Sequence, residues 1–416
     1  MCNVWLGGLD WNISCNGNKL NPMTIFETLG VRTIINAKGP ATRLSGGILA
    51  PEVAAAMAEA SQACVDIAEL QAAASARIAE ATGAEAGYIA SGASACLLLA
   101  AAASVTGLDP GRMARLPDTR AMKSQAIMVR SQRNFYDHAI RAAGLTIVEV
   151  GLPNRYAGAG VRDAEVWEIE DAIGERTAAI YYVADSAARP LLAEVVAVAR
   201  RHNVPVIVDA AAQLPPQTNL RRFIAEGADL VAFSGGKAIG GPQASGILCG
   251  KRDLVMAAAL QHLDMDIYWD LWEPPPSLID KARLRGAPPH GIGRSCKAGK
   301  EEIAGLLTAL RLFITEGDAR RHARWLADCE TIAGALSAVP VSISGRGDTS
   351  VVPVVELDLN ARHITATGLC LMLQRADPAI AVDPASRDRN IVRVNPMCLK
   401  PGEAETVGRA IAKLLC

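Results

Sequence analysis

From about residue 50, helical spacing of apolar residues alternates along the chain with short β-branched runs. The stretches PEVAAAMAEASQAC and DIAELQAAASARIAEATG are rich in alanine and have apolar residues three and four apart, so they predict helices. Predicted strands are GYIA, AIMVR, TIVEV, TAAIYYV, VPVIVDA and DLVAFSG, each separated from the next by a helix-length stretch. This alternation predicts an α/β fold with a large, mostly parallel sheet that helices cover on both faces.

The alternation stops after Leu248, which suggests a second unit. Residues 263–298 are rich in Pro and Gly and predict an irregular connection. A long helix at about 299–315 then leads to strands near 340–345, 350–357 and 390–394, and to a helix at 402–415. We therefore predict an irregular extension at 1–22, an N-terminal segment at 23–50, a large domain at 51–262 and a small C-terminal α+β domain at 299–416.

Composition narrows the class of protein. The chain has 416 residues, of which 50% are hydrophobic, and a net charge of −1 without long runs of one sign, so no nucleic-acid footprint is visible. The ten cysteines form no C-x-x-C pair, which favours reduced thiols in the cytosol over a zinc site or a disulfide framework. No secretory signal is visible, and the longest apolar run, residues 95–105, is too short for a bilayer. These features predict a cytoplasmic enzyme without a membrane partner.

The candidate chemistry centres on Lys237, in the stretch VAFSGGKAIGGPQASGILCG. A phosphate-binding P-loop would need Ser or Thr after the lysine and Gly at its start, but Ala238 and Val231 occupy these positions. No clean G-x-G-x-x-G follows a predicted strand, so a dinucleotide site has little support. The remaining alternatives are a covalent cofactor lysine and an ordinary solvated loop lysine.

Pyridoxal phosphate would need features that the sequence supplies in order. A lysine on a tight glycine turn can reach the cofactor aldehyde, and Ser234 could bind its phosphate. Asp209, at the end of VPVIVDA, could partner the ring nitrogen, and SGASA (residues 91–95) could form a phosphate cup at a helix start. Taken singly, the aspartate could be a helix cap and SGASA a plain turn, but their combined order favours the cofactor.

Three blocks carry a family resemblance: GADLVAFSGGKAIGGPQASGILCGKRDLV, VPVIVDAAAQLPP and GRSCKAGKEEIAGLLTALRLFI. They resemble the SelA-like branch of fold-type I pyridoxal-phosphate enzymes, from about Met23 to the C-terminus, and YDHAIRAAG and RSCKAGKEE look closer to its D-glucosaminate-6-phosphate ammonia-lyase group. The resemblance implies that Lys237 bonds to pyridoxal 5'-phosphate and that Asp209 partners its ring nitrogen. It implies a phosphate site lined by Ser91, Gly92, Ala93, Ser94 and Ser234. It also implies a homodimer or a larger even-numbered homo-oligomer.

The chain departs from the selenium transferases of this branch. Those enzymes carry an arginine-rich stretch before their second core helix and an extra N-terminal domain that grips tRNA. Here the matching stretch reads CVDIAELQ, and residues 1–22 are too few for a domain. We therefore expect no nucleic-acid partner.

Several residues are candidates for binding substrate. Arg294, Lys297 and Lys300 form a cationic cluster at a helix start, where an anion would offset their charge, although a solvated basic turn is the plain alternative. Arg43, near Asn36 and Thr42, competes with Arg393 to bind a substrate carboxylate. His138, beside Tyr136, is a candidate to stack on the cofactor ring, although a local hydrogen-bonding role is equally ordinary. The histidine spacing suggests no metal site.

The predicted activity is a lyase that eliminates water and ammonia from a 2-amino-3-hydroxy acid, such as an amino-sugar acid, to give a 2-keto acid. Other outcomes stay open: seleno- or sulfur-transfer to aminoacyl-tRNA, racemisation, transamination, or a non-catalytic cofactor-binding relative.

Overall fold

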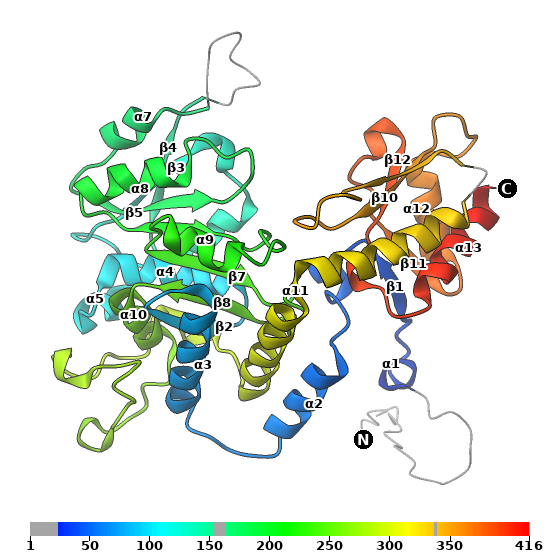
Figure 1. Cartoon of the computed structure of the whole chain (residues 1–416). Helices are drawn as coiled ribbons and strands as arrows, with labels where there is room; N and C mark the ends of the chain where they lie inside the picture. Colours follow the sequence, from blue (N-terminus) through cyan, green and yellow to red (C-terminus); the bar gives the residue numbers. More distant parts are fainter. Residues whose placement is uncertain (1–23, 153–162, 337–338, 416) are drawn as a thin grey trace, which may run out of the picture.

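The computed structural model describes residues 24–152, 163–336 and 339–415. Figure 1 shows a larger unit and a smaller unit, linked by the N-terminal segment and by helix α11 (Lys300–Gly334). The predicted extension at 1–22 lies outside the described residues. Within the described part of the chain, no helix combines the length and apolar character that crossing a membrane requires.

The larger unit is built on a seven-stranded sheet with the strand order β2-β8-β7-β6-β5-β3-β4. Its strands are β2 (Ala86–Ala90), β3 (Gln125–Val129), β4 (Thr146–Val150), β5 (Thr177–Val183), β6 (Val206–Asp209), β7 (Leu230–Ser234) and β8 (Gly246–Gly250). Strand β8 runs antiparallel to both of its neighbours, and the other pairs are parallel. The mostly parallel sheet is therefore confirmed. The sequence pattern missed β8, because this strand returns directly from β7 without a helix between them.

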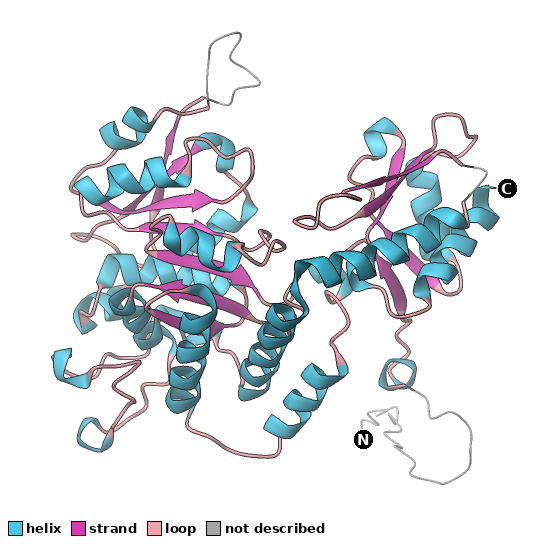
Figure 2. Cartoon of the chain, viewed as in Figure 1, coloured by secondary structure: helices cyan, strands magenta, loops and turns pink. Residues whose placement is uncertain are grey.

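Helices cover both faces of this sheet (Figure 2), which explains why its strands are apolar along nearly their whole length. One face packs against α3 (Ile67–Thr82), α7 (Val166–Asp171), α8 (Leu192–Arg201), α9 (Asn219–Ala225) and the first half of α11. The other packs against α4 (Ala93–Thr106), α5 (Pro110–Arg115), α6 (His138–Ala142) and α10 (Arg252–His262). Successive residues of a strand alternate between these two cores, so neighbours such as Tyr181 and Tyr182 face opposite helix layers.

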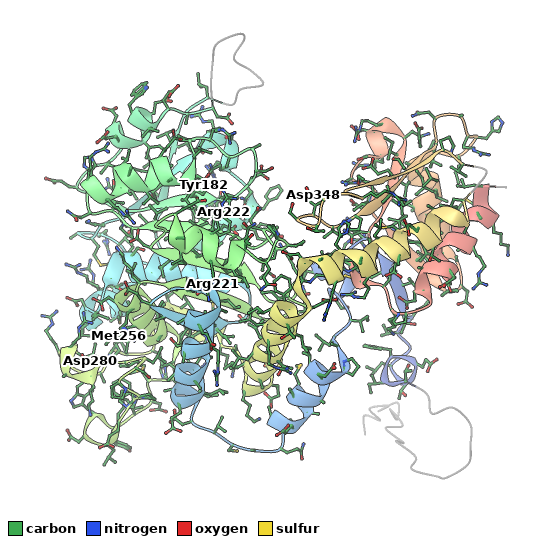
Figure 3. All side chains as sticks on the ribbon, in the orientation of Figure 1. Tyr182, Arg221, Arg222, Met256, Asp280 and Asp348 are labelled. Carbon is green, nitrogen blue, oxygen red and sulfur yellow. The ribbon has the colours of Figure 1, made fainter. Side chains whose placement is uncertain are left out.

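The smaller unit has its own core and combines both ends of the chain. Its antiparallel strands are β9 (Val341–Ser344), β10 (Val354–Asp358) and β12 (Ile391–Val394), and its helices include α12 (Ala366–Arg375) and α13 (Glu403–Leu415). A parallel pair joins β1 (Ile34–Ala37) to β11 (Ala379–Val382), so part of the N-terminal segment belongs to this unit. Asp348, on the turn between β9 and β10, lies on the side that faces the larger unit (Figure 3).

Helix α11 is longer than the predicted helix at 299–315 and bends inside. Gly317 has φ 72° and ψ 162°, which interrupts the helix between its two halves. Residues before the bend, such as Phe313, pack in the core of the larger unit, whereas Cys329 and Ile332 pack in the core of the smaller one. The predicted end at about residue 315 lies close to this bend, where Gly317, a poor helix former, interrupts the helical backbone.

Candidate active site

The carboxyl ends of β2, β6 and β7 bring the predicted cofactor residues to one edge of the sheet. Cross-strand pairs join Ala90 to Gly246 and Gly246 to Ser234, so the turn that begins at Ser91 and the end of β7 lie on either side of the start of β8. On the other side of β7, Ala232 pairs with Asp209. Ligands in open α/β sheets bind at this edge.

The turn between β2 and α4 is shaped to receive an anion. Gly92 is the N-cap of α4 with φ 138°, and no side chain caps the helix, so its first amides remain available to a ligand. The start of β8 approaches this turn very closely. A Cβ atom at Gly246 would lie 2.4 Å from the carbonyl carbon of Gly92 and 2.6 Å from the nitrogen of Ala93. Only glycine at this position of β8 fits the observed turn.

Asp209 is a buried carboxylate, 8% exposed, at the end of β6. Its Oδ2 accepts a hydrogen bond from the hydroxyl of Tyr181 at 3.1 Å, and its Oδ1 accepts one from the backbone N–H of Ala211 at 3.0 Å. Burial nevertheless raises the pKa of Asp209, because these two donors do not fully offset the lost hydration. A buried carboxylate whose lost hydration is only partly offset is stabilised by a cationic partner. A protonated pyridine nitrogen would be such a partner.

Lys237 follows β7 on the glycine turn, where its carbonyl accepts a hydrogen bond from the N–H of Gly240 at 2.9 Å. Burial lowers the pKa of Lys237, and the nearby charge of Asp209 opposes this shift only in part. A lowered pKa increases the neutral amine fraction, which is the form that attacks an aldehyde. The amine, the carboxylate and the open amides of α4 together fit pyridoxal phosphate.

Two buried polar atoms near this edge have no hydrogen-bond partner in the described part of the chain. The Oε1 of Gln132 accepts a hydrogen bond from the N–H of Val183, which pairs with Asp209, but its Nε2 has no partner. The Nε2 of Gln243 donates to the hydroxyl of Thr42 at 3.0 Å, but its Oε1 has no partner. Unpaired buried polar groups are costly unless a ligand or water satisfies them, so both fit a ligand site.

The N-terminal segment connects the smaller unit to the glycine-rich turn that contains Lys237, called the lysine turn below. The side chain of Asn36 is buried and donates to the carbonyls of Gly39 and Gly46, at 3.0 and 2.8 Å, which holds the segment in a loop. Within that loop, the Thr42 hydroxyl accepts a hydrogen bond from Gln243, which follows the lysine turn. Arg43 is exposed and makes no ion pair with another described residue.

Arg393, the competing candidate, lies on β12 opposite Glu356, and its Nε is 3.1 Å from Glu356 Oε1. The N–H of Asn395 donates to the carbonyl of Ala37 at 2.9 Å, which ties β12 to the N-terminal segment. The structure therefore brings Asn36 and Arg393 into the same part of the smaller unit.

The backbone carbonyl of Cys296 connects the segment of the cationic cluster to the turn between β2 and α4, called the phosphate turn below. The carbonyl of Cys296 accepts hydrogen bonds from the N–H of Ser91 at 3.1 Å and from Nε2 of His262 at 2.9 Å. Burial lowers the pKa of His262 to about 4, so its ring is neutral near pH 7. With Nε2 donating to this carbonyl, Nδ1 of the neutral ring accepts a hydrogen bond from the hydroxyl of Tyr88 at 2.8 Å.

The three cations of the cluster differ in their partners. Arg294 pairs with Asp264 at 3.0 Å, and Lys300 pairs with Glu301 at 2.5 Å. Lys297 is exposed and makes no ion pair with another described residue. Lys297 is thus the member of the cluster whose charge is least compensated.

His138 begins α6 and is exposed, and the preceding Phe135 and Tyr136 are 91% and 64% exposed. Asp137, between Tyr136 and His138, is buried and pairs with Arg133 at 2.5 Å, which fixes the backbone of this segment. His138 makes no hydrogen bond with another described side chain, so its position allows but does not require a contact with a ligand.

Sequence reasoning missed Tyr181, His262, Gln132 and Gln243, although some of them left a signal. Tyr181 is one of two adjacent tyrosines in the largely apolar run TAAIYYV, and His262 ends a largely apolar helix. Both belong to buried surroundings that require a hydrogen-bond partner for a polar atom. The two glutamines gave no such signal, because Gln132 ends a short 3-10 helix and Gln243 lies in a turn, where polar residues are ordinary.

Comparison with known proteins identifies several related chains. A family model described as SelA, L-seryl-tRNA selenium transferase, matches residues 67–266. A D-glucosaminate-6-phosphate ammonia lyase of Salmonella typhimurium is 32% identical over 91% of this chain and 94% of its own. The chain belongs to the SelA-like family of fold-type I pyridoxal-phosphate enzymes. This SelA-like chain is thus a pyridoxal-phosphate-dependent enzyme related to an ammonia-lyase.

Further relatives and solved structures are also similar to this SelA-like chain. A Streptomyces protein named 5'-C-glycyluridine monooxygenase-decarboxylase is 32% identical over 94% of this chain and 92% of its own. A solved structure of D-glucosaminate-6-phosphate ammonia-lyase superposes with a TM-score of 0.75 and 29% identity, covering 94% of this chain and 99% of that one. A SepCysS–SepCysE N-terminal domain complex, 14% identical with a TM-score of 0.55 and covering 92% and 96% of the two chains, shows the fold alone.

Proposed function

We propose that this enzyme eliminates water and then ammonia from a 2-amino-3-hydroxy acid and releases a 2-keto acid. The observation that carries the proposal is that Lys237, the buried carboxylate of Asp209 and the uncapped start of α4 lie at one edge of the sheet. The ammonia lyase of Salmonella typhimurium, aligned over 91% of the chain, supports this outcome over transamination or racemisation.

Each residue has a role in the proposed reaction. When bound, pyridoxal phosphate supplies a ring that accepts electron density from the substrate α-carbon. Asp209 stabilises positive charge at the ring nitrogen, and the amides at the start of α4 hold the phosphate. The Nζ of Lys237 takes the α-proton and then donates a proton to the departing β-hydroxyl group.

The atoms of the proposed reaction balance. Removal of the α-proton and of the β-hydroxyl group, as water, leaves a double bond between these two carbons. The released enamine gains a proton at the β-carbon, and water replaces the nitrogen, which leaves as ammonia. One substrate molecule thus gives one keto acid and one ammonia.

The two ends of the substrate would meet different parts of the site. A bidentate arginine, Arg43 or Arg393, would hold the carboxylate. Arg294 and Lys297, which the Cys296 carbonyl ties to the phosphate turn, would hold an anionic group at the far end of an amino-sugar acid. His138 would contact the cofactor ring, and Asn36 and Thr42 would shape the N-terminal wall.

A second candidate reaction comes from the Streptomyces relative, which matches as well as the lyase does and is named a monooxygenase-decarboxylase. Oxygen-dependent decarboxylation of an amino acid is therefore the main alternative. Transfer to tRNA has less support, because a Desulfovibrio desulfuricans selenium transferase is 28% identical over only 57% of this chain.

The deciding experiment incubates the cofactor-loaded protein with a panel of 2-amino-3-hydroxy acids, including plain and phosphorylated amino-sugar acids. The proposal requires equal amounts of ammonia and keto acid without oxygen uptake. Oxygen consumption together with carbon dioxide release would replace it with the second candidate. Racemisation, or amino transfer without free ammonia, would overturn the lyase assignment and leave the cofactor assignment intact.

The assembly expected from the resemblance also belongs to the proposal. Helix α1 (Ile25–Thr28) buries none of its residues, and Ile25, Phe26 and Leu29 are 58%, 51% and 54% exposed. Such adjacent apolar exposure favours contact with a second copy. Light scattering should show a homodimer or a larger even-numbered oligomer.

A further inference from the structure

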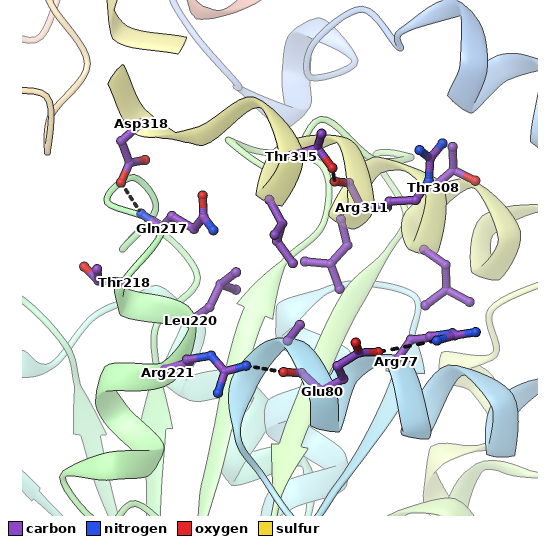
Figure 4. Close-up of a pocket in the computed structure, with 14 residues that line it drawn as sticks. Arg77, Glu80, Gln217, Thr218, Leu220, Arg221, Thr308, Arg311, Thr315 and Asp318 are labelled. Carbon is purple, nitrogen blue, oxygen red and sulfur yellow. Dashed lines mark hydrogen bonds and ion pairs between the residues drawn. The ribbon is translucent and has the colours of Figure 1, made fainter. Parts of the chain in front are cut away.

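A cavity separate from the candidate active site lies between α3, α9 and the first half of α11. Figure 4 shows Arg77, Glu80 and Arg221 along one side of it, and Thr308 and Thr315 of α11 on the other. Its volume is about 1000 Å³. Small-molecule sites typically measure roughly 300–1,000 Å³, so the cavity could hold a small organic ligand. None of the residues assigned to cofactor or substrate lines it.

The cavity has an apolar wall and a cationic rim. The apolar wall consists of Ala81, Leu220, Leu307, Leu310 and Ile314. Three arginines, Arg77, Arg221 and Arg311, lie around it with two acids, Glu80 and Asp318. Apolar lining with a few charged groups at fixed positions is typical of sites that orient a small ligand.

Two of the three guanidinium groups lack an acidic partner in the described part of the chain. Arg221 donates to the backbone carbonyl of Glu80, and Arg311 makes no ion pair or side-chain hydrogen bond with another described residue. Arg77 lies 3.4 Å from Glu80, but both side chains are about three-quarters exposed, so this pair is weak. The rim therefore favours an anion.

The cavity ends at the bend of α11. Its lining includes Asp318, which follows Gly317, the residue with φ 72° inside the helix. Asp318 accepts a hydrogen bond from the N–H of Gln217, also a lining residue, at 2.8 Å, and one from Arg321 at 2.7 Å. Arg321 is 1% exposed and stacks on Phe313 at 3.7 Å, which links the two halves of the helix across the bend.

We propose that this cavity is a regulatory binding site for a small amphipathic anion, which occupies the apolar wall, pairs with Arg221 and Arg311, and stiffens α11 at the bend. The two halves of α11 belong to different cores, so a ligand that contacts the helix beside Gly317 biases the orientation of the two units. This inference does not depend on the reaction proposed above.

The test uses anilinonaphthalene sulfonate, a fluorescent amphipathic anion, with the full chain loaded with pyridoxal phosphate so that the lysine site is filled. Binding should saturate at one probe per chain. Replacing both arginines, Arg221→Ala and Arg311→Ala, should weaken binding by about tenfold or more, since each removes a charge-assisted hydrogen bond. Ala81→Phe should block binding by filling the cavity.

The matched control is Arg320→Ala, which removes an exposed arginine of α11 that does not line the cavity and should leave binding unchanged. Hydrogen exchange of the amides at residues 313–325 should slow when the probe binds. Equal binding by the double arginine variant and the wild type would overturn the site. Binding without slower exchange at the bend would overturn its regulatory role.

Discussion

The hydroxyl of Tyr181 donates a hydrogen bond to Oδ2 of Asp209 at 3.1 Å, between adjacent strands β5 and β6. Both side chains lie on the face that packs against α4. The hydrogen bond stabilises the ionised carboxylate against the burial that raises the pKa of Asp209. Tyr181 is therefore a positioning residue for the charge that the cofactor ring would meet.

Tyr181→Phe should weaken binding of pyridoxal phosphate by about tenfold, because a hydrogen bond to a charged group contributes roughly 1.5 kcal/mol or more. The affinity is measured by titrating cofactor-free protein and following absorbance. Tyr182→Phe is the matched control, since that hydroxyl donates to the Pro190 carbonyl at 3.3 Å in the opposite core. A similar loss in both variants would argue against a specific role for Tyr181.

Gly246→Ala should displace the phosphate turn, since the new Cβ would overlap backbone atoms of Gly92 and Ala93. We expect affinity for pyridoxal phosphate to fall at least about tenfold, while affinity for pyridoxal, which lacks the phosphate, changes much less. Gly174→Ala is the control, because nothing lies within 4 Å of its Cβ position. Equal losses for the two ligands would mean that the turn does not hold the phosphate.

His262 makes stability depend on pH. Its pKa falls from 6.5 to about 4 in the folded chain, so the unfolded chain binds more protons between these values. Stability from the neutral ring is complete above pH 6.5 and is lost as pH falls toward 4. Between pH 8 and pH 5 this loss is about 2 kcal/mol.

Urea unfolding of the cofactor-free protein at both pH values checks this expectation. In His262→Gln the ring is absent, so the pH-dependent loss should be smaller than in the wild type by about 2 kcal/mol. The same pH dependence in both proteins would show that His262 titrates normally.

Arg294→Ala should raise KM for a phosphorylated substrate by about tenfold and change KM for the dephosphorylated form little, because a charge-assisted contact to phosphate is lost. Steady-state kinetics with the two substrates measures the difference. Arg283→Ala is the control: this arginine lies in the same Pro- and Gly-rich connection and pairs with Asp253 at 2.6 Å. Equal effects on KM for both substrates would indicate that Arg294 supports the local structure and does not bind the substrate phosphate.

The sequence predicted the layers of the larger unit because its helices and strands have strong and distinct periodicities. It missed β1 and β11, whose parallel pairing joins residues more than three hundred positions apart, such as Ile34 and Ala379. Four-residue strands leave little local signal, and the pairing depends on tertiary contacts.

For the candidate site, the sequence predicted that Lys237, Asp209 and the turn at Ser91 lie at one edge of the sheet, because Asp209 ends a recognisable strand and the other two follow one. The link from Ser91 through the Cys296 carbonyl to His262 could not, because it joins three segments that are far apart in the chain. Polar atoms that meet only in the folded structure leave no spacing to detect.

The central claim is that Lys237 bonds covalently to pyridoxal phosphate. The most direct measurement is borohydride reduction of the cofactor-loaded protein, followed by absorbance and peptide mass spectrometry. We predict that reduction abolishes the visible absorbance band and leaves the cofactor attached to the peptide that contains Lys237, and that Lys237→Ala has neither the band nor the adduct. A band that persists in Lys237→Ala, or an adduct on another lysine, would contradict the account.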